Sequence, residues 1–147
     1  ILSDTSCLIL FQKIGELKLL QKVYTEIIIT PEVLLEYNES VPGWIKIQAV
    51  KDKEKQKELE KLVDLGEASV IALALELTNS ILIIDDKKGR KLAAKLKINI
   101  TGTLGTLLKA KEKGVISQIK PLLIKLNEVD YRISDTIVQG ILKMAGE

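Results

Sequence analysis

The sequence predicts an α/β domain with a mostly parallel central sheet. Short apolar runs alternate with helical segments along the whole chain, as in proteins built from βαβ units. Several of these runs consist of Ile, Leu and Val and are short enough to be buried strands. Acidic or hydroxyl residues directly follow some of them, at the edge where an open parallel sheet binds its ligands.

Five runs are predicted as strands because they are apolar, often β-branched and bounded by polar or turn residues. The first ends on Asp4, and the fourth ends on Asp85-Asp86. The third follows the turn signal Pro42-Gly43. The five predicted strands are residues 1–3, 26–29, 44–50, 81–84 and 98–101.

Nine further segments have helical periodicity. Gly15 separates the first two, and Thr30-Pro31 is a hydroxyl N-cap followed by Pro at the first helical position. Gly114 closes the seventh. The fifth begins at Glu67, is apolar almost all round and is therefore predicted to be buried. The predicted helices are residues 6–11, 17–24, 30–39, 51–63, 67–78, 87–97, 104–113, 117–128 and 134–145.

Composition sets broad limits on the class of protein. A chain of 147 residues with 46% hydrophobic and 29% charged residues is expected to form one domain, residues 1–147, with a substantial core. No run approaches the roughly 18 apolar residues of a membrane span. One cysteine fits a reducing, cytoplasmic setting. The net charge of +2 argues against a strongly basic protein that coats nucleic acid.

The chain contains no histidine. This excludes a histidine general base, a Ser-His-Asp triad and every zinc site that uses histidine. With a single cysteine, Cys7, any bound metal must be held by oxygen ligands, which favours Mg²⁺ or Mn²⁺. Cys7 itself lies in an apolar run and is interpreted as a core residue.

Three acidic residues are candidates for a site, and each also has an ordinary structural explanation. Asp4 follows the first strand, but Asp is a preferred N-cap, and taken alone capping is the better interpretation. Glu36 borders the apolar stripe of helix 30–39, where it can be an ordinary, partly exposed helix residue without a functional role. Glu67 begins the buried helix, where the macrodipole alone favours an anion.

Asp85-Asp86 is harder to explain by capping, because one N-cap residue is enough. If the strands that precede Asp4 and Asp85 are neighbours, these carboxylates meet at one edge of the sheet. Clustered carboxylates raise each other's pKa unless a cation neutralises them. Such an oxygen-only cluster suits divalent metal, which can activate water for in-line attack at phosphorus.

In this ordered set of motifs the chain resembles the PIN domain family, the small metal-dependent ribonuclease fold of VapC-type toxins. The resemblance covers essentially the whole chain, and no single motif in it is specific. The later segment also resembles a prokaryotic PIN branch of mostly uncharacterised proteins. The motifs are Asp4-Thr5-Ser6, Glu36 on the Thr30-Pro31 helix, residues 65–69, Ile83-Ile84-Asp85-Asp86 with Gly89-Arg90, and residues 100–104.

The resemblance implies a three-layer α/β/α sandwich with about five strands and an acidic cleft at the carboxyl edge of the sheet. Asp4 would be the central metal ligand, with Ser6 steadying it by hydrogen bonding, and Thr103 would orient a water or a phosphate. Glu36 and Glu67 would hold metal directly or through water. Asp86 aligns better than Asp85 with the family's acid after the fourth strand, and Asp85 stays an alternative ligand. The implied catalytic residues are Asp4, Glu36, Glu67 and Asp86.

Glu67 departs from the family pattern, because toxin members usually carry Asp at this position. The longer side chain is expected to shift the metal outward, which leaves metal occupancy and rate open. An acidic site also needs nearby cations to hold a nucleic acid strand. The expected RNA-binding residues are Lys87, Lys88, Arg90 and Lys91, and for Lys95 a solvated helix face is the better interpretation.

The leading hypothesis is a Mg²⁺- or Mn²⁺-dependent endoribonuclease, a candidate toxin of a toxin–antitoxin pair. A non-catalytic PIN-like module that binds RNA or protein is the alternative. A haloacid-type phosphatase fits poorly, because Ser6 stands where its second Asp is required. By analogy with the family, the expected partners are RNA, a small antitoxin protein and a second copy of the chain in a homodimer, in the cytoplasm and without a membrane.

Overall fold

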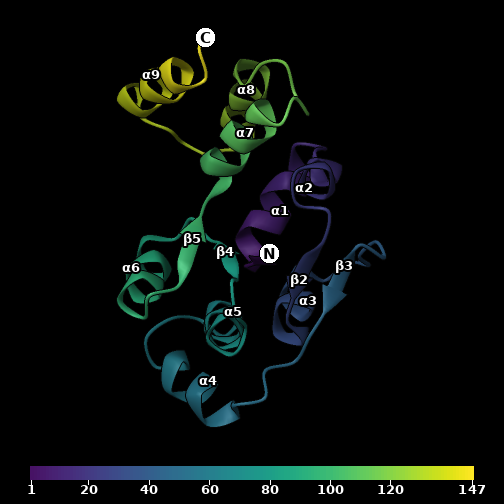
Figure 1. Ribbon diagram of the computed structural model, residues 1–147, viewed down its shortest axis with the longest axis vertical. Coiled ribbons are helices and arrows are strands. Elements are labelled where there is room, and N and C mark those ends of the chain that lie inside the picture. The colour runs from purple at the N-terminus through teal and green to yellow at the C-terminus, as the bar shows by residue number, and fades with distance from the viewer.

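The computed structural model describes residues 1–147 and contains one five-stranded sheet. All strand pairs are parallel, and the order across the sheet is β3-β2-β1-β4-β5. The first strand, β1, therefore lies at the centre, between β2 and β4 (Figure 1). The strands are β1 (Leu2–Ser3), β2 (Ile27–Ile29), β3 (Ile45–Ile47), β4 (Ile81–Ile83) and β5 (Asn99–Thr101).

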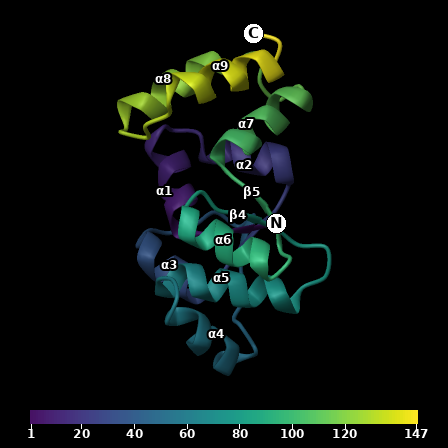
Figure 2. The ribbon, with the colours of Figure 1, turned by 90° about the vertical axis from the view of Figure 1, so that its left-hand side faces the viewer.

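Nine helices flank this sheet in an α/β/α sandwich. Helix α5 packs against β1 and β4 and also against α3 and α4, whereas α2 packs against β2 and α7. Figures 1 and 2 both place α7, α8 and α9 at one end of the molecule and α4 at the opposite end. The helices are α1 (Thr5–Lys13), α2 (Leu17–Tyr24), α3 (Pro31–Tyr37), α4 (Lys53–Glu60), α5 (Leu65–Glu76), α6 (Lys87–Lys95), α7 (Thr103–Glu112), α8 (Lys120–Glu128) and α9 (Asp135–Met144).

Helix α5 is the buried helix that the sequence predicted. Every residue from Ala68 to Ala74 is buried, and Ile71 and Leu73 are fully inaccessible. Small residues alternate with branched ones along this helix, so it can lie close to β1 and β4 on one side and to α3 and α4 on the other. None of the helices is both long and apolar enough to cross a bilayer.

Several element boundaries differ from the prediction for local reasons. Helix α5 begins at Leu65 because the Asp64 side chain accepts the backbone N–H of Glu67 at 2.9 Å and so caps the helix two residues earlier. Helix α3 ends at Tyr37 because Asn38 adopts the left-handed conformation, with φ 57°. Helix α8 begins at Lys120, three residues later than predicted from Ser117.

The C-terminal residue joins three elements at the far end of the molecule. The Glu147 carboxylate accepts the backbone N–H groups of Ile119 and Lys120 at 2.7 and 3.2 Å, and it pairs with Lys111 at 3.0 Å. These bonds hold the pKa of Glu147 below its usual value. Helix α8 has no side-chain cap of its own, so Glu147 satisfies its first N–H groups instead.

Candidate functional site

The pairing of β1 with β4 brings the two main acidic segments to one edge of the sheet. Ser3 is in register with Ile83, and the backbone N–H of Asp4 bonds to the Ile83 carbonyl at 3.2 Å. Asp4 and Asp85-Asp86 therefore leave neighbouring strands at the same carboxyl edge. This is the condition under which the sequence predicted that their carboxylates would meet.

Asp4 is buried at the start of α1, with 2% of its surface exposed. Its Oδ1 accepts the backbone N–H of Cys7 at 3.0 Å, so Asp4 does cap the helix. This cap uses Oδ1 and leaves Oδ2 for another ligand. Burial raises the pKa of Asp4 to about 6, and the charges of Asp85 and Asp64 add to this effect.

Glu36 reaches this edge through the residue that follows Asp4. The Thr5 hydroxyl donates to Glu36 Oε1 at 2.6 Å, which ties α3 to the start of α1. Gly66, in the first turn of α5, makes room for the contact, because a Cβ at position 66 would collide with the Glu36 carboxylate. The resulting contact sets Glu36 beside Thr5 and Gly66, one residue from Asp4.

Glu67 lines a hollow of about 340 Å³ together with Asp64 and Asp86, the N-caps of α5 and α6, and with Glu60 at the end of α4. Lys61 and Lys88 also line it. Its Oε2 atom is buried and has no hydrogen-bond partner. Burial raises the pKa of Glu67 to about 8, helped by the neighbouring carboxylates of Asp64, Asp86 and Asp4. A second glycine, Gly89, permits this packing, because its Cβ would lie 2.6 Å from Glu67 Oε2.

The two acids after β4 have different surroundings. Asp85 is fully engaged inside the protein: its Oδ1 accepts the backbone N–H of Thr103 at 2.9 Å, and its Oδ2 accepts the Thr103 hydroxyl at 2.6 Å. Asp86 is exposed, lines the hollow beside Glu67 and caps α6 with Oδ2, which leaves Oδ1 free. The surroundings therefore favour Asp86 over Asp85 as a ligand.

These residues have the chemistry that a divalent cation needs, although they do not yet surround one point. The group offers oxygen donors alone, and it includes a buried carboxylate oxygen with no partner, Glu67 Oε2. A bound cation stabilises clustered acids whose pKa values are raised. No three acidic side chains are close enough together in this structure to hold an ion between them. Cation binding would therefore need these side chains to move closer together.

Comparison with known proteins identifies the fold family. A family model described as a PIN domain matches residues 1–147. The chain belongs to the PIN domain family. PIN domains are typically nucleases and generally use divalent metal ions. The searches of curated proteins and of solved structures find no match.

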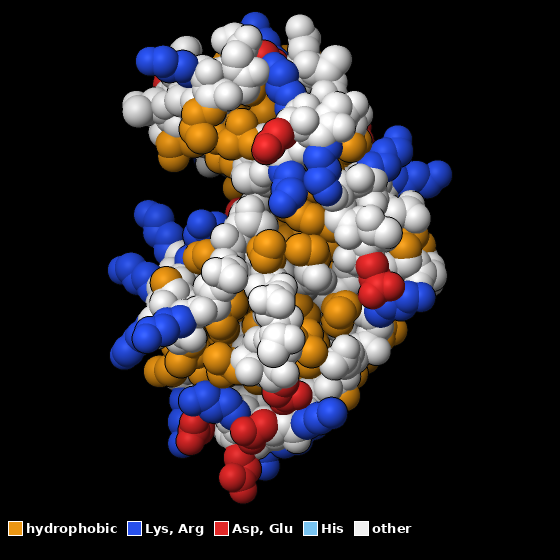
Figure 3. Space-filling view, viewed as in Figure 1, with side chains coloured by type: hydrophobic (Ala, Val, Ile, Leu, Met, Phe, Trp, Pro, Cys, Tyr) orange, Lys and Arg blue, Asp and Glu red, His pale blue; other side chains and the backbone are white.

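The basic residues of this PIN domain divide into two groups. Lys87, Lys88 and Lys91 are exposed on α6, and Lys88 lines the acidic hollow. Figure 3 shows Lys and Arg side chains gathered over α6, below an indentation that separates it from α9. Arg90, by contrast, is half-buried and donates to the Ile84 carbonyl at 2.9 Å. It secures the β4–α6 connection, so the expectation that it is free to bind RNA does not fit this structure.

Two supporting roles expected from the sequence also differ in the structure. The Ser6 side chain is exposed and forms no hydrogen bond with Asp4. Thr5 makes the contact to a neighbouring acid instead. The Thr103 hydroxyl is already bonded to Asp85, so in this PIN domain Thr103 fixes that acid and the start of α7.

Asp64 is the acid that the sequence reading missed. It lines the hollow with Glu67 and Asp86 and acts on the pKa of both Glu67 and Asp4. The signal was present in the chain, because Asp64 and Glu67 have the spacing of a capping box, an N-cap acid followed three residues later by Glu. Placing the helix start at Glu67 concealed it.

Proposed function

We propose that this PIN domain is a Mg²⁺- or Mn²⁺-dependent endoribonuclease that hydrolyses RNA phosphodiester bonds. The observation that carries the proposal is the buried, partnerless Glu67 Oε2, which lies in an acidic hollow with Asp64 and Asp86 at the carboxyl edge of the sheet. A buried carboxylate oxygen without a hydrogen-bond partner lowers the stability of the fold unless a bound ligand compensates. A divalent cation is the ligand that matches oxygen donors of this charge.

The proposed roles follow from the free atoms of each acid. Asp4 Oδ2 and Asp86 Oδ1 remain available, while the other oxygen of each carboxylate caps a helix. Glu67 would complete the set, and Glu36, held by Thr5, would act through water. When bound, the cation would supply Lewis acidity toward the phosphate and a water of lowered pKa for in-line attack. The attack forms a new P–O bond and releases the adjacent nucleoside oxygen.

Lys87, Lys88 and Lys91 would hold the RNA backbone beside the acids. Phosphate contacts of this kind depend on salt and carry no sequence information. The net charge of +2 fits modest affinity. We therefore expect weak sequence preference, and we propose single-stranded RNA as the substrate.

RNA cleavage in the presence of Mn²⁺ tests the proposal. Asp4→Asn should abolish cleavage, because Asn keeps the cap but loses the charged ligand. Asp52→Asn is the matched control: Asp52 caps helix α4 in the same manner, by accepting the backbone N–H of Lys55 at 3.1 Å. It lies at the end of α4 away from the hollow, so the change should leave cleavage unchanged. Equal cleavage by the wild-type protein, Asp4→Asn and a chelator-treated sample would refute the proposed activity.

A second candidate function is a PIN-like module that binds RNA or protein without cleaving it. One observation favours it: no three acids are within coordinating distance of one point, and Glu67 is longer than the Asp of toxin members. Calorimetric titration with MnCl₂ separates the candidates, because a binding module need not take up the ion. Binding of RNA without Mn²⁺ uptake or cleavage would favour the module.

The biological setting belongs to the same proposal. As a nuclease the protein would suit the toxin of a toxin–antitoxin pair, kept inactive by a small antitoxin protein that covers the acidic site. A homodimer is proposed as its assembly, with the cytoplasm as its location. Co-expression with the product of a neighbouring gene, followed by the cleavage assay, tests the toxin role. Sedimentation equilibrium tests the dimer.

A further inference from the structure

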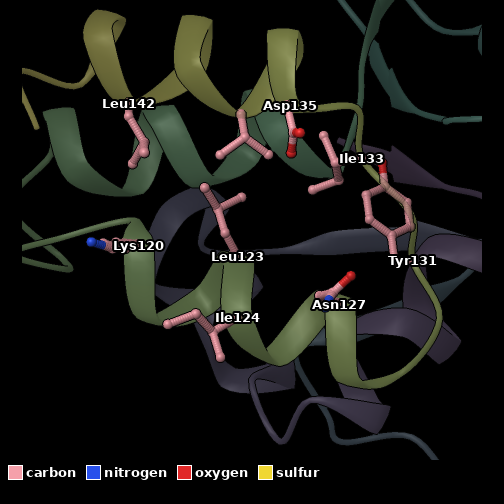
Figure 4. Close-up of a pocket in the computed structure, with 9 residues that line it drawn as sticks. Lys120, Leu123, Ile124, Asn127, Tyr131, Ile133, Asp135 and Leu142 are labelled. Atoms are coloured by element: carbon pink, nitrogen blue, oxygen red, sulfur yellow. The ribbon is translucent and has the colours of Figure 1, made fainter.

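A second hollow, of about 300 Å³, lies between α8 and α9. Figure 4 shows Leu123 of α8 and Leu142 of α9 facing each other across it. Tyr131 and Ile133, from the segment that joins the two helices, form one end. The hollow is largely apolar, and helix α9 beside it has no buried residue. The hollow is therefore open to a ligand from outside the protein.

Polar groups are confined to the rim of this hollow. Asn127 lies beside the Tyr131 ring, Asp135 stands at the start of α9, and Lys120 marks the opposite end (Figure 4). An apolar slot with an aromatic wall and an amide at its edge matches a nucleobase, which has apolar faces and a polar edge. Proteins that read single-stranded RNA stack unpaired bases on aromatic rings and bond their edges to side chains.

Tyr131 also connects this hollow with the acidic site. In Figure 4 its hydroxyl points away from Asn127 and α8. Asp85 and Thr103 are close enough to that hydroxyl to act on the pKa of Tyr131, which burial and then the Asp85 charge raise. Asp85 immediately precedes Asp86 of the acidic site. One side chain thus forms a wall of the hollow and lies near Asp85, the residue before Asp86 of the acidic site.

The surroundings fit a polyanion better than a second protein surface. In Figure 3 hydrophobic side chains form the wall of the indentation on the α9 side, and Lys and Arg side chains form the wall on the α6 side. An RNA strand has both kinds of group, bases for the apolar wall and phosphates for the lysines. The small volume of the hollow accepts one flat group more readily than the face of a helix.

We propose that the hollow between α8 and α9 binds one unstacked base of the single-stranded RNA on which the acidic site acts. The inference rests on the proposed function. It adds a position along the strand at which the base itself contributes to binding, whereas the phosphate contacts elsewhere are independent of sequence.

The test is an abasic scan of a fluorescently labelled single-stranded oligoribonucleotide. Binding is measured by anisotropy at low salt with a chelator present, so that no strand is cleaved. Removing the base at one position should weaken binding by the wild-type protein roughly 10-fold, as expected for a base stacked on an aromatic ring. Removal at the other positions should have little effect. This part of the test uses the unaltered protein.

Two variants assign the effect to Tyr131. Tyr131→Phe keeps the ring and should retain the position-specific loss, because the hydroxyl points away from Asn127 and α8. Tyr131→Leu removes the ring and should bind the intact strand about as weakly as the wild-type protein binds the abasic one. Gln139→Ala, on the exposed surface of α9, is the control and should match the wild-type protein.

A flat abasic profile from a protein that still cleaves RNA would overturn this inference and leave the proposed function intact. Persistence of the position-specific loss in Tyr131→Leu would place the base elsewhere and also overturn it. Dissociation of a dimer by Tyr131→Leu, with RNA binding unchanged, would show that the hollow joins two copies of the chain. Absence of both RNA binding and cleavage in the wild-type protein would reject the proposed function together with the inference.

Discussion

The Thr5 hydroxyl donates a 2.6 Å hydrogen bond to Glu36 Oε1 and so links the residue after Asp4 to the last turn of α3. Two segments 31 residues apart in the sequence are joined by this bond at the edge of the sheet. Gly66 of α5 leaves the space that the Glu36 carboxylate occupies. Three separate helices therefore have to be placed correctly before one carboxylate reaches the site.

Thr5→Val should separate Glu36 from the site at a small cost in stability. Val has the shape of Thr without the hydroxyl, and Glu36 is exposed, so water can replace the lost donor. We expect the free energy of unfolding to fall by about 1 kcal/mol and cleavage to decrease. Urea unfolding and the RNA assay measure the two effects. Thr5→Ser keeps the hydroxyl and should behave like the wild-type protein; equal activity of Val and Ser variants would remove Glu36 from the account.

Asp4→Asn should stabilise the metal-free protein at neutral pH. The pKa of Asp4 in the folded state, about 6, lies above the ordinary value of 3.8, so the folded state binds the proton more tightly. The stability from protonated Asp4 is complete below pH 3.8 and is lost as the pH rises through 6. Asn does not ionise and so avoids this loss. Above pH 6 the free energy of unfolding of the variant should exceed that of the wild-type protein by up to about 3 kcal/mol.

Chemical denaturation in EDTA at pH 4 and pH 7.5 measures this difference. The wild-type protein and Asp4→Asn should be similarly stable at pH 4 and diverge at pH 7.5. A variant that is less stable than the wild-type protein at both values would mean that the Asp4 charge helps the fold and is not held for a cation.

Mn²⁺ binding at pH 7 should release about one proton per ion, because the pKa of Glu67 is near 8 and the ion needs its ionised form. At pH 9 Glu67 is already ionised, and the release should disappear. Calorimetric titration in two buffers with different ionisation enthalpies counts the protons. Glu67→Gln should abolish the release, and an enthalpy independent of buffer at pH 7 would show that Glu67 does not bind the ion.

Gly66→Ala should lower activity without unfolding the protein. The new methyl group meets the Glu36 carboxylate, the end of a flexible side chain that can move away, while Ala favours the helix by about 1 kcal/mol over Gly. Gly140→Ala is the matched control, since a Cβ there meets nothing within 4 Å. Both variants should keep or raise the melting temperature, and Gly66→Ala alone should lose cleavage.

Replacing Lys87 and Lys88 together by Ala should weaken RNA binding and its dependence on salt. For single strands the slope of log affinity against log salt should become shallower by about 0.7 for each phosphate that the protein no longer neutralises. Lys53→Ala/Lys57→Ala, on exposed positions of α4 that do not line the hollow, removes equal charge elsewhere. Equal changes in the two double variants would indicate a nonspecific effect of net charge.

Much of this architecture was predictable because strong local signals agreed with the fold. The β-branched runs predicted five strands, and the apolar stretch after Glu67 predicted the buried α5. The adjacency of β1 and β4, on which the acidic site depends, is a long-range pairing that follows from no local pattern. The family resemblance supplied it, and the structure confirms it.

Details of the site depended on contacts that the sequence does not encode locally. Asp85 and Asp86 are alike in the sequence, but Thr103, 18 residues beyond Asp85, forms a hydrogen bond with Asp85 and none with Asp86. Arg90 resembles its basic neighbours, yet the turn of α6 directs it to the Ile84 carbonyl. The raised pKa of Glu67 arises first from its burial and then from the packing that brings Asp64 and Asp86 beside it.

The central claim is that acids from separate segments form one cation site, and locating the ion tests it most directly. A crystal soaked in MnCl₂ and measured at the manganese absorption edge should show an anomalous peak at bonding distance from Asp4 Oδ2 and from the carboxylates of Glu67 and Asp86. An absent peak, or one that touches a single acid while Asp4 and Asp86 only cap their helices, would contradict the account.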